Sequence, residues 1–147
     1  MANKRSVILQ GTPVVTEEGT ASAEVRPGYL VDGTVDIAHH ASAGGNTPRA
    51  VALERDELGK GIDNTYQGSG TDSAFYASGE RVKTATLYPG CRATMFIASG
   101  QDIQANEKLE SAGDGTLRAL AAGTPLFRSL DEVGAVTELT AIRVEAF

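Results

Sequence analysis

Short apolar runs separated by turn residues make up most of the chain from Val25 onward. Cys91–Ala98 shows the clearest alternation, because every second position would share one face of a strand. The buried face of that strand would carry Cys91, Ala93, Met95 and Ile97. Thr140–Ala146 alternates in the same way near the end of the sequence. Both segments therefore predict strands with one buried face.

Clusters of Gly, Pro, Asn and Asp separate the runs and predict the turns. Asp32-Gly33 and Asp114-Gly115 each suit a hairpin, because glycine accepts a positive φ angle. The runs between turns predict further strands at Gly28–Val31, Thr34–Ile37, Ala50–Glu54, Arg81–Leu87, Lys108–Ser111 and Thr116–Ala119. About nine short strands at this spacing favour a sandwich or barrel. We therefore predict an all-β fold, a small antiparallel β-barrel or sandwich with an extended N-terminal arm and little helix.

The first 24 residues differ from the rest of the sequence. Thr16–Ala23 has no periodicity and few large apolar side chains, so we expect this stretch to be free or docked on a partner. We predict an arm at 1–24 and a β-barrel domain at 25–147. Contacts to a capsid or a neighbouring chain are predicted at Asn3, Lys4, Arg5, Val7, Ile8 and Leu9. The basic residues would lie on an acidic surface and the apolar ones would add a strand to a neighbour, with a frayed terminus as the alternative.

Charge and composition narrow the classes of partner. The chain has 147 residues, with Lys+Arg 13 against Asp+Glu 19, which gives a formal net charge of −6. A protein that binds nucleic acid directly needs several cations on one face, so we expect no such contact. No apolar run approaches the roughly 18 residues of a membrane span, so no membrane partner is expected. The single cysteine, Cys91, excludes an intrachain disulfide and indicates a reducing compartment.

No stretch of the sequence predicts a catalytic centre. Hydrolase and phosphate-binding motifs are lacking, and Cys91 has the pattern of a small core residue. The adjacent His39 and His40 would point to opposite faces of a strand, so they are expected at a polar loop edge rather than on one ion. The alternative is a metal shared between subunits at a symmetry axis. We expect no cofactor, no metal and no enzymatic activity, and therefore a structural or binding role.

The order of several fragments carries a resemblance to a known family. They are Ala50-Val51-Ala52-Leu53-Glu54, Gly59-Lys60-Gly61-Ile62-Asp63, Gly79-Glu80-Arg81-Val82, Leu87-Tyr88-Pro89-Gly90, Ala98-Ser99-Gly100-Gln101-Asp102-Ile103 and Lys108-Leu109-Glu110-Ser111-Ala112-Gly113-Asp114-Gly115-Thr116-Leu117. In this order the chain, from Val25 to Val133, resembles the head decoration (capsid cement or capsid stabilisation) proteins of tailed bacteriophages. Each fragment alone is a generic strand and turn, so the order carries the resemblance.

The resemblance implies a structural virion protein. It implies a small β-rich homotrimer that binds the outer surface of the expanded head at three-fold or quasi-three-fold sites and cements neighbouring major capsid subunits. The partners would be the major capsid protein and other copies of the chain, and the protein would be made in the host cytoplasm. The family supplies no catalytic residues. The alternatives are a particle-displayed β-domain that binds a host-surface glycan or receptor, and a small enzyme with a metal shared at His39 or His40.

Overall fold

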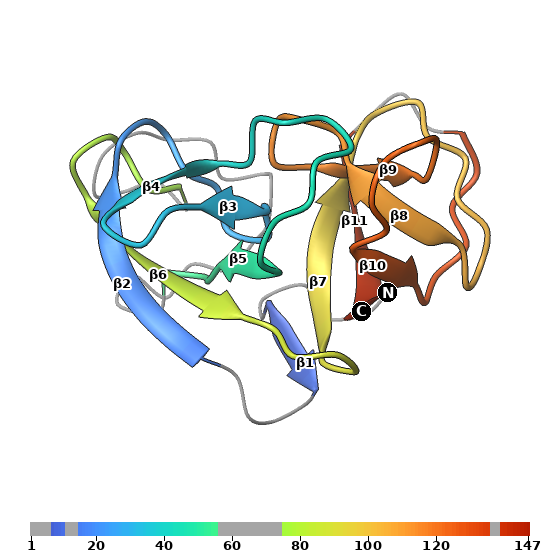
Figure 1. Ribbon diagram of the computed structural model, residues 1–147, viewed down its shortest axis with the longest axis horizontal. Helices are drawn as coiled ribbons and strands as arrows, with labels where there is room; N and C mark the ends of the chain where they lie inside the picture. Colours follow the sequence, from blue (N-terminus) through green and yellow to red (C-terminus); the bar gives the residue numbers. More distant parts are fainter. Residues whose placement is uncertain (1–6, 11–14, 56–74, 136–138) are drawn as a thin grey trace.

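A small closed barrel forms one part of the fold. The computed structural model describes residues 7–10, 15–55, 75–135 and 139–147. The barrel strands are β7 (Arg92–Ile97), β8 (Lys108–Ser111), β9 (Leu117–Ala119), β10 (Phe127–Ser129) and β11 (Thr140–Ala146). They follow the order β7-β11-β10-β8-β9, and β9 returns to β7 through a parallel pair, which closes the barrel (Figure 1).

A second sheet lies beside the barrel, on the left of Figure 1. Its strands are β2 (Val15–Ala21), β3 (Val31–Asp32), β4 (Asp36–His39), β5 (Ala50–Ala52) and β6 (Arg81–Thr86). Their order is β3-β4-β2-β6-β5, with β2 and β4 parallel and the other pairs antiparallel. The described residues contain no helix. The predicted all-β fold is confirmed.

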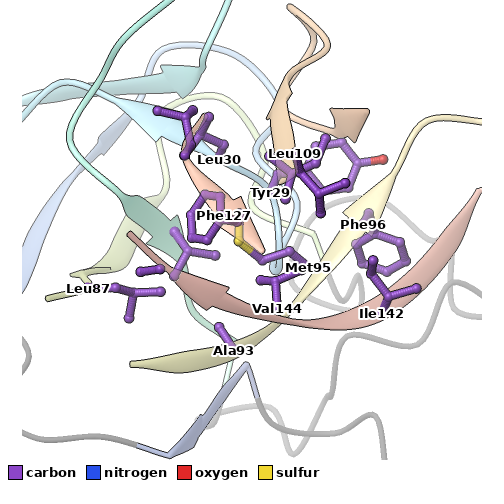
Figure 2. Close-up of a cluster of buried hydrophobic side chains, with 14 of the residues drawn as sticks. Tyr29, Leu30, Leu87, Ala93, Met95, Phe96, Leu109, Phe127, Ile142 and Val144 are labelled. Atoms are coloured by element: carbon purple, nitrogen blue, oxygen red, sulfur yellow. The ribbon is translucent and has the colours of Figure 1, made fainter. Parts of the chain in front are cut away.

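The larger of two hydrophobic cores fills the barrel interior and extends beyond it to residues such as Tyr29, Leu30 and Val51. Figure 2 shows side chains from four barrel strands pointing into it, among them Met95, Leu109, Phe127 and Val144. The prediction of one buried face for β7 was incomplete, because Thr94 and Phe96 on its other face are also buried. The ring of Tyr29 covers that face, with its centroid 5.5 Å from the centroid of Phe96. The side chain that buries this second face of β7 therefore comes from a loop. The alternation of residues within β7 cannot reveal such a contact.

Three separate segments accept the backbone hydrogen bonds donated along the edge of β7 that faces away from β11. The donors are the backbone N–H groups of Thr94, Phe96 and Ala98. Their carbonyl acceptors, at 2.7, 3.2 and 2.9 Å, are Val7, Gly28 and Leu117. At Gly28 the φ angle is +83°, and a Cβ there would lie 3.2 Å from the Phe96 ring, so only glycine fits without strain. The edge of a central strand is thus paired along its length.

Turn chemistry predicted the hairpins well. Lys108–Ser111 forms β8 as predicted, and it pairs antiparallel with β9 around the turn that contains Asp114-Gly115. Asp32-Gly33 also lies in a hairpin, between β3 and β4. Both connections are longer than two residues, because β4 begins only at Asp36 and β9 only at Leu117. β10 was not predicted.

The predicted arm contributes strands where the structure describes it. β1 (Ile8–Gln10) pairs with β7, and β2 pairs with β6 over six positions and with β4 over two. The lack of large apolar side chains in Thr16–Ala23 therefore does not keep this segment out of the fold, because backbone pairing on two sides holds it. The predicted domain boundary after residue 24 would separate β2 from β3, β4, β5 and β6, with which it forms one sheet.

Candidate functional site

A row of polar side chains crosses the outside of the barrel. Direct pairing across five neighbouring strands joins, in order, Lys108, Arg128, Glu145, Arg92 and Gln10. Directly opposed residues of antiparallel strands share one face of the sheet, so these side chains lie on the same side. Their neighbours along the strands point inward and are buried, namely Leu109, Phe127, Ala146 and Ala93. We call these five outward residues the basic row.

A single carboxylate holds the two arginines of the basic row. Glu145 Oε1 lies 3.2 Å from Arg92 Nε, and Glu145 Oε2 lies 2.5 Å from Arg128 Nη2. Arg128 also donates from Nη1 to Asn106 Oδ1 at 2.6 Å. The hydrogen bond from Arg128 lowers the pKa of Glu145, so the carboxylate is ionised at neutral pH. With three cations and one anion, the basic row has a charge of +2 on a chain whose net charge is −6.

Three large apolar side chains are exposed beside the part of the basic row that contains Glu145, Arg92 and Gln10. They are 40%, 44% and 40% exposed, and we call them the apolar rim: Leu9, Tyr88 and Phe147. Leu9 precedes Gln10, Tyr88 lies in the β6–β7 turn, and Phe147 follows β11 two positions after Glu145. Backbone bonds join that turn to the end of β11, and Figure 1 shows β1 beside the same end of β7. Exposed apolar groups gathered in this way are typical of an interaction surface.

The predicted contact residues fall partly on this surface. Leu9 belongs to the apolar rim, whereas Val7 is buried in the barrel core and Ile8 is partly buried against it. Within the chain, β1 adds to the barrel's own β7, and the N–H of Val7 donates to Glu54 Oε2 at 3.0 Å. Asn3, Lys4 and Arg5 lie outside the described residues. Contact with a capsid or a neighbouring chain stays a prediction for all six residues.

The histidines lie in the joint between the second sheet and the barrel, and the expected polar loop edge was wrong. His40 is buried, and its Nδ1 lies 2.6 Å from Ser111 Oγ on β8. The His39 ring stacks on Tyr29 with 4.6 Å between centroids, and its Nε2 accepts a hydrogen bond from the N–H of Arg26 at 3.0 Å. Burial, together with the charge of Arg26, lowers the pKa of His39 to about 4. Both side chains therefore serve packing within the chain.

A shallow depression of about 390 Å³ surrounds the buried Glu110. Its carboxylate bonds to Arg118 Nε at 2.8 Å and to the N–H of Gly123 at 2.7 Å. Burial opposes ionisation, but these donors outweigh it and the pKa of Glu110 is lowered. The carboxylate is occupied by its own chain, so it joins the segments on either side of the depression rather than binding a ligand.

The other residues that were considered for catalysis or binding are part of the packed fold where the structure describes them, with the exception of Tyr88. Cys91 is buried, as predicted for a small core residue. Tyr29 and Tyr76 are buried, and the Tyr76 hydroxyl donates to the carbonyl of Leu53 at 2.8 Å. Tyr88 is the exposed tyrosine, and Tyr66 lies outside the described residues. Within residues 7–10, 15–55, 75–135 and 139–147, no group of three or more His, Cys, Asp or Glu side chains could hold a metal ion.

A membrane-crossing helix, judged by length and apolarity, is not found in the described part of the chain. No family model matches the sequence, and no curated protein matches it. Among solved structures, the fold is similar to the N base of head fiber gp8.5 in bacteriophage phi29. The TM-score is 0.58 and the identity 15%, and the match covers 92% of this chain and 95% of that chain. By its fold, then, the chain is similar to the base of a phage head fiber, in agreement with the resemblance drawn from its sequence.

Proposed function

We propose that this protein is a structural component of a tailed-phage virion, that it binds the outer surface of the expanded head, and that it catalyses no reaction. The observation that carries the proposal is the fold likeness to the N base of a phage head fiber, which spans 92% of this chain and 95% of that chain. The order of fragments that resembles head decoration proteins supports it from the sequence. In this role the chain acts through its surface and needs no cofactor.

The finer proposal is that the protein forms a homotrimer at three-fold or quasi-three-fold sites and cements neighbouring major capsid subunits. A trimer would present three copies of one surface, so contacts that are weak one at a time would be long-lived when all three engage. A standard protein interface of about 1,600 Å² is sufficient for specific docking. The basic row and the apolar rim are exposed groups of the kind such a contact uses.

Cryo-electron microscopy of heads prepared with and without the protein tests this function, combined with a heat challenge. We expect added density on the outer three-fold or quasi-three-fold positions and heads that remain intact at higher temperature. Sedimentation velocity of the free protein should give the mass of a trimer. Bare heads with unchanged heat resistance would refute the proposal. Binding to a glycan array by the same preparation would then favour the displayed glycan- or receptor-binding domain.

A further inference from the structure

The apolar rim lies beside the basic row, at the end of the barrel where β7 begins and β11 ends. Arg92 pairs with Gln10, which follows Leu9 in the chain. Glu145, near the end of β11, lies two positions before Phe147 in the chain. Cationic and large apolar side chains are therefore adjacent here. Val35, the other strongly exposed large apolar residue among those described, lies elsewhere, in the connection between β3 and β4.

We propose that this surface is the one with which the protein docks on the head, and that its occupant is an acidic segment of the major capsid protein that carries an exposed apolar side chain. The inference rests on the proposed function and names the partner's chemistry. The carboxylates of that segment would pair with Arg92 and Arg128, and its apolar side chain would pack on Leu9, Tyr88 and Phe147.

Charge complementarity selects an acidic occupant. The basic row has a charge of +2, whereas the chain as a whole has a charge of −6. An acidic capsid surface would repel most of the molecule and attract this part of it. Such asymmetry orients a protein as it approaches its partner.

The arginines are already held in position for docking. Glu145 bridges both guanidinium groups, and Asn106 takes a third bond from Arg128. Even so, the Arg92 and Arg128 side chains stay 42% and 32% exposed. Side chains that are fixed before binding lose little freedom when the partner arrives, so more of the contact energy appears as affinity.

The composition of the surface favours a protein over a polyanion. Tyrosine, phenylalanine and arginine are enriched in protein interfaces, and tyrosine and arginine carry much of their binding energy. A nucleic acid would meet three cations in the row and would be repelled by the net charge of −6. The apolar rim would also gain nothing from a phosphate backbone. An acidic protein segment satisfies both parts of the surface.

Co-sedimentation of the full-length protein with expanded heads tests the docking surface. The test variants are Tyr88→Ser, Phe147→Ser and the double variant Arg92→Gln with Arg128→Gln. The matched controls are Val35→Ser, which removes an apolar side chain that is 72% exposed, and Arg81→Gln, whose side chain is 77% exposed and paired with Glu18. Each test variant should bind about tenfold more weakly, while the controls bind like wild type. The arginine variant should also show a flatter dependence of affinity on salt.

Each outcome separates the docking surface from the function itself. If wild type binds heads and all test variants bind equally well, the docking surface is wrong and the function stands. If wild type does not bind, the proposed function fails. Melting curves exclude misfolding, and Tyr88→Phe, which keeps the ring, should retain most of the affinity. A test variant that changes the protein's own sedimentation would make the occupant a second copy and overturn the proposal. So would stronger competition from duplex DNA than from poly-glutamate of equal charge.

Discussion

His39 packs between the second sheet and the barrel in a position that requires a neutral ring. Its Nε2 accepts the hydrogen bond from the Arg26 N–H at 3.0 Å, so this nitrogen has no room for a proton of its own. The stacked ring of Tyr29 covers one side of the imidazole, and the Arg26 guanidinium adds a positive charge nearby. Asp114 and Glu24 oppose the charge of Arg26 only in part. Acid should therefore destabilise the fold by protonating His39.

The size of the effect follows from the two pKa values. The pKa of His39 is about 4 in the folded chain and 6.5 in an ordinary environment. That difference corresponds to at most about 3.4 kcal/mol of unfolding free energy. His39 is only partly buried, so solvent screening reduces the effect to about 1–2 kcal/mol. Because the folded pKa is depressed, the stability is fully present above pH 6.5 and is lost as the pH falls from 6.5 toward 4.

Urea unfolding at several pH values between 7 and 5 measures this loss. Wild type should lose about 1 kcal/mol or more over that range. His39→Gln should be less stable at pH 7, because the stacking on Tyr29 is weakened, but its stability should change little with pH. Asp36→Asn provides a matched control, since it changes an exposed titratable group on the same strand and should keep the wild-type dependence. Equal losses of stability in His39→Gln and wild type between pH 7 and 5 would show that His39 is not the source of the acid sensitivity.

Three further pairs of substitutions test the packing by urea or thermal unfolding. Gly123→Ala should lower the free energy of unfolding by about 2–4 kcal/mol, because the new Cβ would collide with the carboxylate of Glu110 and with the backbone of Gly44. In the control Gly134→Ala the new Cβ meets no atom within 4 Å, so stability should change by less than about 0.5 kcal/mol. Gly28→Ala should lower stability more than Gly79→Ala. Both glycines have a positive φ angle, but only at Gly28 would the new Cβ also press on the ring of Phe96. Equal losses of stability would contradict that contact. Met95→Ala should cost about 2–5 kcal/mol, and Met95→Leu less than about 1.5 kcal/mol; similar losses would mean that the barrel interior is not closely packed.

The strands that the sequence predicted are those in which the order of side chains shows an alternation or a recognisable turn. β7 and β11 alternate, and β8 and β9 flank a turn that suits glycine. β2 lacked such a signal because backbone pairing with β6 and β4 holds it, and backbone groups are the same in every residue. β1 was predicted as a strand added to a neighbouring chain, whereas it pairs with β7 of its own chain, and β10 was missed.

The basic row could not be predicted, because it exists only through strand register. Its members run from Gln10 to Glu145 in the sequence and come from five strands. A shift of one position in any strand would turn its member toward the core. Of the apolar rim, the sequence predicted only Leu9 as a contact residue. Tyr88 and Phe147 are residue types that are equally common in a buried core, so their exposure could not be predicted from the sequence. His40 and Ser111, which are 71 positions apart, illustrate the same limit for buried contacts.

The three-segment pairing of β7 has a consequence for how the chain folds during synthesis. The acceptors come from Val7, Gly28 and Leu117, two upstream of the strand and one downstream. A ribosome that has released residues up to Ile97 has therefore exposed a strand whose last partners are not yet made. Pairings so distant in sequence form slowly, and an open strand edge invites association with other nascent chains. Efficient folding should thus depend on the interval between release of β7 and release of β11, so that slower elongation across residues 98–140 would lower the yield of folded protein.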